Sequence, residues 1–176
     1  MYGATFPQVV EFTKQIMTTS ASDFVQDYFQ PHNISSYLQP WNNKQVIKNK
    51  KYNISHPHDN NDTIKQDYTD CFSKYRENLT SSSNEIIFIL VFTWKTIQTD
   101  ILTEFVAFMQ TINRQFKVLL INGLETIPDN LKNFVFHEKI EYKDTFKNDD
   151  WNNDKIQYEK EIYFPKVQTI ISKYVD

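Results

Sequence analysis

Residues 85–94, which read EIIFILVFTW, decide the fold class of this chain. They form an apolar run without helical spacing, and a shorter run of the same kind, FKVLLI, follows at residues 116–121. Strands that are buried on both faces and joined by a crossover helix make the βαβ unit of a parallel sheet. We therefore predict two adjacent parallel strands at 85–93 and 116–121, with an amphipathic helix over residues 100–113 between them.

The segments around this pair predict helices and a few short strands. Apolar spacing of about 3.6 residues indicates helices at 6–16, 23–29, 62–79 and 164–175. The helices over 62–79 and 164–175 are expected to cover the faces of the sheet. Short strands are predicted at 46–47 and 51–56 as a hairpin, and at 134–136, whereas 33–41 is predicted to be a loop or a single turn.

We predict a single three-layer α/β domain over residues 1–176, with a small, mainly parallel central sheet flanked by helices. The composition agrees with a folded chain, because 40% of the residues are hydrophobic and 15% are aromatic. Only Gly3 and Gly123 are glycines, which excludes a glycine-rich nucleotide-binding loop. The net charge of −3 gives no reason to expect a nucleic-acid partner.

The sequence also sets expectations about compartment. A single cysteine, Cys71, excludes an internal disulfide and favours a reducing compartment. The longest apolar run is about half of the roughly 20 residues that a membrane helix needs, so we expect no membrane partner. Residues 1–18 lack the charged-then-apolar pattern of a signal peptide. We expect a cytoplasmic or virion protein that is not secreted.

The densest polar cluster is the segment His56-Pro57-His58-Asp59. In an extended segment, residues two apart point to the same side, so both imidazoles can reach one metal ion. Asp59 or Asp62 could supply an oxygen ligand, but zinc needs a third and usually a fourth ligand, and His32 and His137 are too distant in the sequence. We predict no metal and no cofactor. In this interpretation the segment is a polar loop whose histidines bond to backbone or water, and the alternative is a metal site.

Three further residues are candidates for chemistry. Cys71 falls on the apolar side of its predicted helix, where a thiol is usually a small, unreactive core residue; the alternative is a nucleophile served by His56 or His58. Arg76 on the same helix could clamp a carboxylate or phosphate, or simply lie on the solvated face. Trp94 follows the first buried strand at its carboxyl end.

Ligand crevices in parallel sheets lie outside the carboxyl ends of the strands. A cleft formed by Trp94, Lys95 and the segment after Asn122 is therefore the place where we expect a ligand. The alternative is that Trp94 only closes an edge of the core.

Several features, taken in chain order, resemble a known family. They are Asp23-Phe24, the stretch Tyr52-x-Ile54-x-His56-x-His58-Asp59, the helix with Lys74-Tyr75-x-x-x-Leu79, the strand Ile86-Ile87-Phe88-Ile89 and a late tryptophan after acidic residues. This progression is similar to the domain-of-unknown-function family named for papain-like cysteine peptidases, which occurs in bacteria and large DNA viruses. The resemblance covers most of the chain from Phe6 onward.

The resemblance implies an α/β domain in which His58 serves as base and Asp59 orients it. The family's nucleophile segment, Ser-x-Gly-x-x-Cys, is missing from this sequence, and Cys71 does not match it. Either the chain begins after that segment or it belongs to a degenerate branch. We therefore expect no peptidase activity from this chain.

Two other function classes stay open. The surplus of aromatic residues suits a structural or interaction protein of a larger, for example viral, assembly that binds a protein partner. The second class is an enzyme with hydrolase- or transferase-like activity on a small molecule or glycan, using His56, His58, Asp59 and Arg76. A large exposed apolar patch would favour assembly, and a pocket with converging polar groups would favour the enzyme.

Overall fold

The computed structural model describes residues 5–38, 45–56, 64–81, 85–93, 95–113, 115–148 and 152–175, and for Gln45, His56 and Ile64 the backbone alone. The chain divides into two compact units, Met1–Ser81 and Ser82–Asp176. The single domain expected over residues 1–176 stays a prediction.

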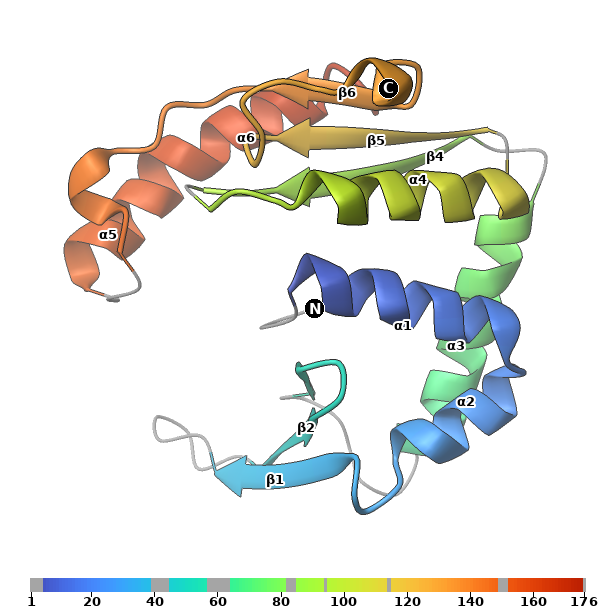
Figure 1. Ribbon diagram of the computed structural model, residues 1–176. Coiled ribbons are helices and arrows are strands. Elements are labelled where there is room, and N and C mark those ends of the chain that lie inside the picture. The colour runs from blue at the N-terminus through green and yellow to red at the C-terminus, as the bar shows by residue number, and fades with distance from the viewer. Residues whose placement is uncertain are drawn as a thin grey trace. The chain divides into compact units, whose positions relative to one another are not determined.

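The N-terminal unit combines three helices with a small antiparallel sheet (Figure 1). The sheet has the strand order β1-β2-β3. Its elements are α1 (Phe6–Thr18), α2 (Ala21–Tyr28), β1 (Ile34–Leu38), β2 (Gln45–Asn49), β3 (Ile54–His56) and α3 (Ile64–Thr80).

The predicted hairpin is confirmed, because β2 and β3 pair antiparallel with Ile47 opposite His56. The prediction of a loop or a single turn at 33–41 is wrong for residues 34–38, which form the edge strand β1. Four of the five β1 residues are exposed, so this strand has no apolar alternation that a sequence could reveal. Helix α2 begins earlier than predicted, because the Ser20 hydroxyl accepts from the Asp23 amide and caps it.

Aromatic rings fill the core of the N-terminal unit. Phe12 of α1 contacts four other rings edge-on, at centroid distances of 5.3 to 6.3 Å. The partners are Phe24, Tyr28, Tyr52 and Phe72. The buried Asn49 amide joins sheet and helix, because it donates to the Tyr28 carbonyl and accepts from the Tyr52 amide.

The helix predicted over 62–79 forms as α3, but its placement differs from the prediction. Its rings Tyr68 and Phe72 join the aromatic core of the N-terminal unit, and α3 packs on α1 and α2. It was expected to cover a face of the parallel sheet. Amphipathic spacing shows that a helix buries one face, but it does not show which partner covers that face.

The C-terminal unit holds the predicted parallel sheet, with strand order β4-β5-β6 (Figure 1). Residues 86–91 and 116–121 pair in parallel, as predicted, and the third strand pairs in parallel with the second. The elements are β4 (Ile86–Val91), α4 (Thr99–Ile112), β5 (Phe116–Ile121), β6 (Val135–Glu138), α5 (Asn153–Tyr158), the π-helical segment η3 (Glu159–Tyr163) and α6 (Phe164–Ile171), with short 3-10 turns at η1 (Asp129–Leu131) and η2 (Asp144–Phe146).

Helices cover both faces of this sheet, which confirms the α/β fold class and a three-layer arrangement within the C-terminal unit. Phe88 packs edge-on against Phe105 of α4 at 5.0 Å. Leu119 and Ile121 pack with Tyr163 and with α6. Because Phe88 lies opposite Val118 in the register, and neighbouring side chains alternate between faces, α4 and α6 cover opposite faces.

The last helix begins earlier than the predicted residue 164 and contains a π turn. Pro165 has no amide hydrogen, so the carbonyl one α-helical turn before it, that of Glu161, loses its usual partner. The backbone widens to a π turn over Glu159–Tyr163 immediately before this proline. The wide turn carries Glu159 and Tyr163, and both are buried.

Candidate functional site

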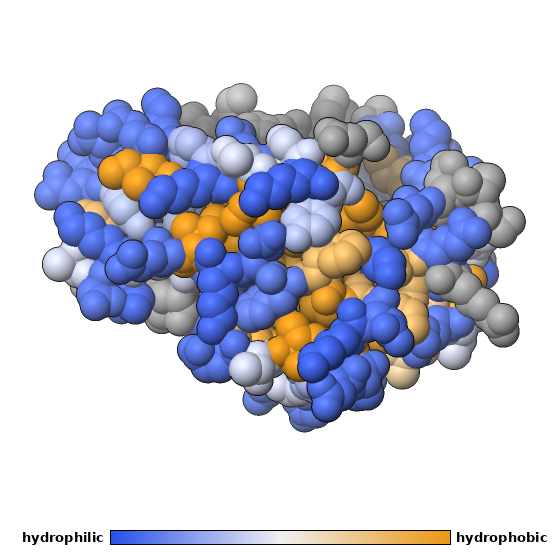
Figure 2. Space-filling model, turned by 90° about the horizontal axis from the view of Figure 1, so that it is seen from above, coloured by the Kyte–Doolittle hydropathy of each residue, from blue (hydrophilic) through white to orange (hydrophobic). Residues whose placement is uncertain are grey.

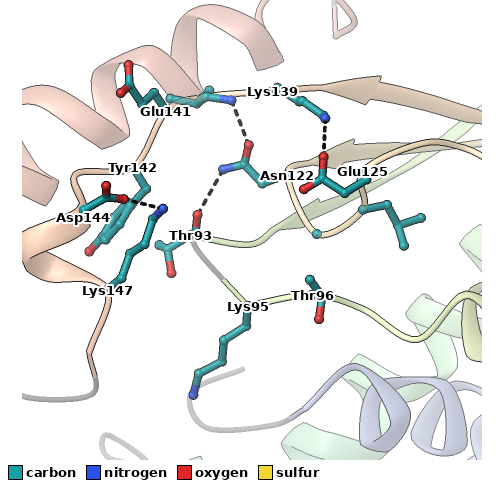
Figure 3. Close-up of a pocket in the computed structure, with 13 residues that line it drawn as sticks. Thr93, Lys95, Thr96, Asn122, Glu125, Lys139, Glu141, Tyr142, Asp144 and Lys147 are labelled. Atoms are coloured by element: carbon teal, nitrogen blue, oxygen red, sulfur yellow. Dashed lines mark hydrogen bonds and ion pairs between the residues drawn. The ribbon is translucent and has the colours of Figure 1, made fainter.

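A pocket of about 260 Å³ lies at the carboxyl edge of the parallel sheet. Figure 3 shows its lining, which comes from the segments that leave the three strands. They are Thr93, Lys95 and Thr96 after β4, residues 122–125 after β5, and residues between 139 and 147 after β6. The cleft expected from Lys95 and the segment after Asn122 is therefore present at the predicted edge.

Asn122 ties the three strand ends together beneath the pocket. Its side-chain amide donates to the carbonyl oxygens of Phe92 and Thr93, at 2.9 and 3.2 Å. Its side-chain oxygen accepts from the Ile140 amide at 2.8 Å. The Asn122 amide nitrogen lies 3.3 Å from the Tyr163 hydroxyl. One side chain thus links the ends of β4 and β6 to the π turn.

The backbone at this point has the left-handed conformation. Asn122 has a φ of 59° and Gly123 a φ of 83°. A Cβ on Gly123 would lie 2.8 Å from Cδ2 of Phe92, so only glycine fits there without a shift of that ring. The Asn-Gly pair therefore turns the chain sharply and forms a fixed floor for the pocket.

Two buried tyrosines support the same edge. The Tyr163 hydroxyl donates to the Phe92 carbonyl at 2.9 Å, and burial raises the pKa of Tyr163 to about 12. The Tyr142 hydroxyl donates to the Glu159 carboxyl group at 2.5 Å. Burial, and then the hydrogen bond to Glu159, raise the pKa of Tyr142 well above its usual range. Both phenols therefore stay protonated and act as hydrogen-bond donors at neutral pH.

Charged side chains of both signs surround the mouth. Lys139 pairs with Glu125 at 3.0 Å, and Lys147 pairs with Asp144 at 2.6 Å, which raises the pKa of Lys147. Both ion pairs are solvent-exposed, so they open at low cost when a ligand offers a better partner. In Figure 3 the ammonium group of Lys147 points toward the carboxylate of Asp144.

The described lining of the pocket consists mainly of polar and charged side chains. It includes lysines, carboxylates, threonines and Tyr142, and among the described lining residues there is no cysteine, serine or histidine. Lysines, hydroxyl groups and carboxylates suit the recognition of a polar molecule.

The structure leaves several predicted site residues without a described position. His58, Asp59 and Trp94 lie outside the described residues, and of His56 only the backbone is described, at the end of β3. The catalytic roles predicted for His56, His58 and Asp59, and the ligand-binding role predicted for Trp94, stay predictions.

Cys71 and Arg76 both lie on α3 in the N-terminal unit. Cys71 is exposed, which corrects the expectation of a buried thiol between Tyr68 and Phe72. The buried stripe runs through Phe72 and Leu79, and Cys71 sits about 100° around the helix from Phe72. Arg76 donates from Nη1 to the Thr19 carbonyl at 2.9 Å, so it holds the end of α1 against α3.

Among the residues that the structure describes, no group of three or more histidine, cysteine, aspartate or glutamate side chains could hold a metal ion. Within the same residues, every helix is too short or too polar to cross a membrane.

Sequence reasoning missed most of the residues that build the pocket. Lys139, Tyr142, Asp144 and Lys147 belong to a segment without periodic pattern, and their position depends on where β6 ends. Two signals were available for the floor and its support. An Asn-Gly pair directly after a buried strand marks a left-handed turn, and a proline inside a helical pattern marks a distorted turn.

No protein-family model, no curated protein and no solved structure matches this chain.

Proposed function

We propose that this chain is a binding domain without peptidase activity, whose C-terminal unit binds a small polar molecule with an anionic group. The observation that carries the proposal is the pocket at the carboxyl edge of the parallel sheet, whose lining includes Lys95, Lys139 and Lys147 as well as three carboxylates. Open α/β sheets bind their ligands at this edge because loops from neighbouring strands converge there.

The lining suggests the chemistry of the ligand. Lysine ammonium groups recognise a carboxylate or phosphate, while Thr93, Thr96 and Glu141 suit hydroxyl groups. The volume of about 260 Å³ is slightly below the usual range for drug-sized ligands, so a metabolite-sized molecule fits. A small hydroxylated acid or phosphate ester, including a sugar derivative, is the ligand class that we propose.

Thermal unfolding with added anions tests this proposal. We expect inorganic phosphate, and more strongly glycerol phosphate, to raise the melting temperature relative to chloride at the same ionic strength. At tenfold excess over Kd, binding stabilises the folded state by about 1.4 kcal/mol, which corresponds to a shift of about 3–6 °C. No shift with either anion would contradict the proposal.

Two lysine variants locate the binding. Lys147→Met should abolish the shift, because Lys147 lines the pocket and its exposed ion pair contributes little to stability. Lys160→Met is the matched control, because Lys160 is exposed and does not line the pocket. A shift lost equally in both variants would indicate nonspecific charge screening.

We expect no peptidase activity, and this expectation can be tested separately from ligand binding. The resemblance to papain-like cysteine peptidases would require a thiolate beside His58, and the single thiol, Cys71, lies exposed on α3. We expect no hydrolysis of a fluorogenic peptide library. Cys71→Ser should shift the melting temperature by less than about 1 °C, because exposed side chains contribute little to stability. Rapid alkylation of Cys71 that His58→Ala abolishes would refute this prediction.

A second candidate function is an interaction protein of a larger assembly. Figure 2 shows apolar side chains gathered toward the middle of one face, with polar side chains around and between them. Exposed apolar side chains of this kind mark binding surfaces when they are contiguous. Several large apolar residues of the C-terminal unit are more than a third exposed: Ile89, Val91, Phe136, Ile156, Ile162, Phe164 and Val175.

A further inference from the structure

The first strand of the parallel sheet is an edge strand without the usual protection. The six residues of β4, Ile86–Val91, are all apolar and include no charge, proline or glycine. Natural edge strands are normally shielded by charges, prolines, bulges or short length, because an open edge pairs with other strands. The opposite edge strand, β6, has four residues, two of which are His137 and Glu138.

The backbone of β4 offers hydrogen-bonding groups on its outer side. The amides of Ile86 and Phe92 donate to carbonyl oxygens at the two ends of β5. Because bonding direction alternates along a strand, the even-numbered residues face β5, and Ile87, Ile89 and Val91 direct their N–H and C=O groups outward. Within the described residues, the sheet has three strands and ends at β4.

The side chains of β4 are also incompletely covered. All six retain partial exposure, and Ile89 and Val91 are each 38% exposed. Five of the six residues of β5, the central strand, are buried. The outer side of β4 therefore combines backbone donors and acceptors with an apolar surface, which are the two components of a strand-addition site.

We propose that β4 pairs antiparallel with β4 of a second copy of this chain, across a two-fold axis at Ile89. In this register Ile89 faces Ile89, and Ile87 faces Val91 of the other copy. Every residue in these pairs directs its backbone N–H and C=O groups outward, so the pairing satisfies the hydrogen-bonding groups of both edge strands at once. The two three-stranded sheets then form one continuous six-stranded sheet.

Charge favours a second copy as the occupant. An uncharged strand excludes partners that would bury a charge against it, and among the described strands β4 alone is wholly apolar. Antiparallel pairing separates the two Glu85 side chains to opposite ends. Each Glu85 then lies opposite Thr93 of the other copy, so the register brings no like charges together.

Sedimentation and light scattering test the oligomeric state. Between about 1 and 100 µM we expect a concentration-dependent dimer, and Ile89→Lys should weaken its Kd by at least about 100-fold. Phe136→Lys is the matched control on the opposite edge, where the exposed fraction is 37% against 38% for Ile89. It should leave the dimer intact, and circular dichroism checks that both variants fold.

A cross-linking experiment tests the register without a buried charge. In a Cys71→Ser background, Ile89→Cys should form a disulfide-linked dimer on mild oxidation. Residues that pair across an antiparallel ladder have Cα atoms about 5.5 Å apart, within the range of a disulfide. Phe136→Cys in the same background should stay monomeric on a non-reducing gel.

A protein that stays monomeric over the whole concentration range would overturn the proposal, even if β4 accepted a strand from another protein. A dimer that Ile89→Lys and Phe136→Lys weaken equally would also overturn it. These outcomes do not depend on the pocket, since Ile89 lies outside its lining.

Discussion

Asn122→Ala should lower the free energy of unfolding of the C-terminal unit by about 3–4 kcal/mol. Alanine pays about 1 kcal/mol to adopt the left-handed backbone that Asn122 has at φ 59°. The substitution also removes the donor to Phe92 and Thr93 and the acceptor for the Ile140 amide. Each of these partly buried groups then loses a partner, at about 1 kcal/mol each.

Asn122→Gly separates the effect of backbone strain from the effect of the lost hydrogen bonds. Glycine accepts the left-handed conformation without strain but lacks the amide, so it should lose only the hydrogen-bond part, about 2–3 kcal/mol. Hydrogen exchange read by mass spectrometry should show that both variants exchange faster than the unmodified chain in β4, β5 and β6. The increase should be smaller in α1–α3. Equal stability of Asn122→Ala and the unmodified chain would show that Asn122 does not hold the strand ends.

The parallel sheet could be predicted from the sequence because both strands are apolar runs without helical spacing. The expected burial on both faces holds for β5, five of whose six residues are buried, but not for β4, whose six residues all retain partial exposure. Residues 86–91 and 116–121 contain one charged side chain between them, Lys117, and both runs are too short for a buried helix. The antiparallel strand β1 has no such apolar run, since four of its five residues are exposed.

The position of the candidate site was predictable, but most of its chemistry was not. The edge follows from a topological rule, because the carboxyl ends of parallel strands lie together. The charges at the mouth follow from the path of residues 139–147 after β6, which no periodic pattern describes. Asn122 shows the same limit: its partners lie 18 to 41 residues away in the sequence, and only the folded chain brings them within reach.

The aromatic core of the N-terminal unit provides the second large effect. Phe12→Ala should destabilise this unit by about 3–5 kcal/mol, because it removes a ring from a closely packed site. Phe12 is 3% exposed and contacts Phe24, Tyr28, Tyr52 and Phe72 within 6.3 Å. Edge-to-face contacts between rings stabilise the fold beyond the burial of apolar area. Truncation of Phe12 to alanine therefore loses both the ring contacts and the buried area.

Chemical denaturation measures this loss, and Tyr37→Ala is the control in the same unit. Tyr37 is 45% exposed, so its truncation should cost less than about 1 kcal/mol. In hydrogen exchange, Phe12→Ala should speed exchange in α1, α2 and α3, because their buried sides share one aromatic cluster. Faster exchange confined to α1 would mean that the three helices do not unfold as one cooperative element. If Phe12→Ala lowered the free energy of unfolding as little as Tyr37→Ala does, the site would have collapsed around the missing ring and recovered its contacts.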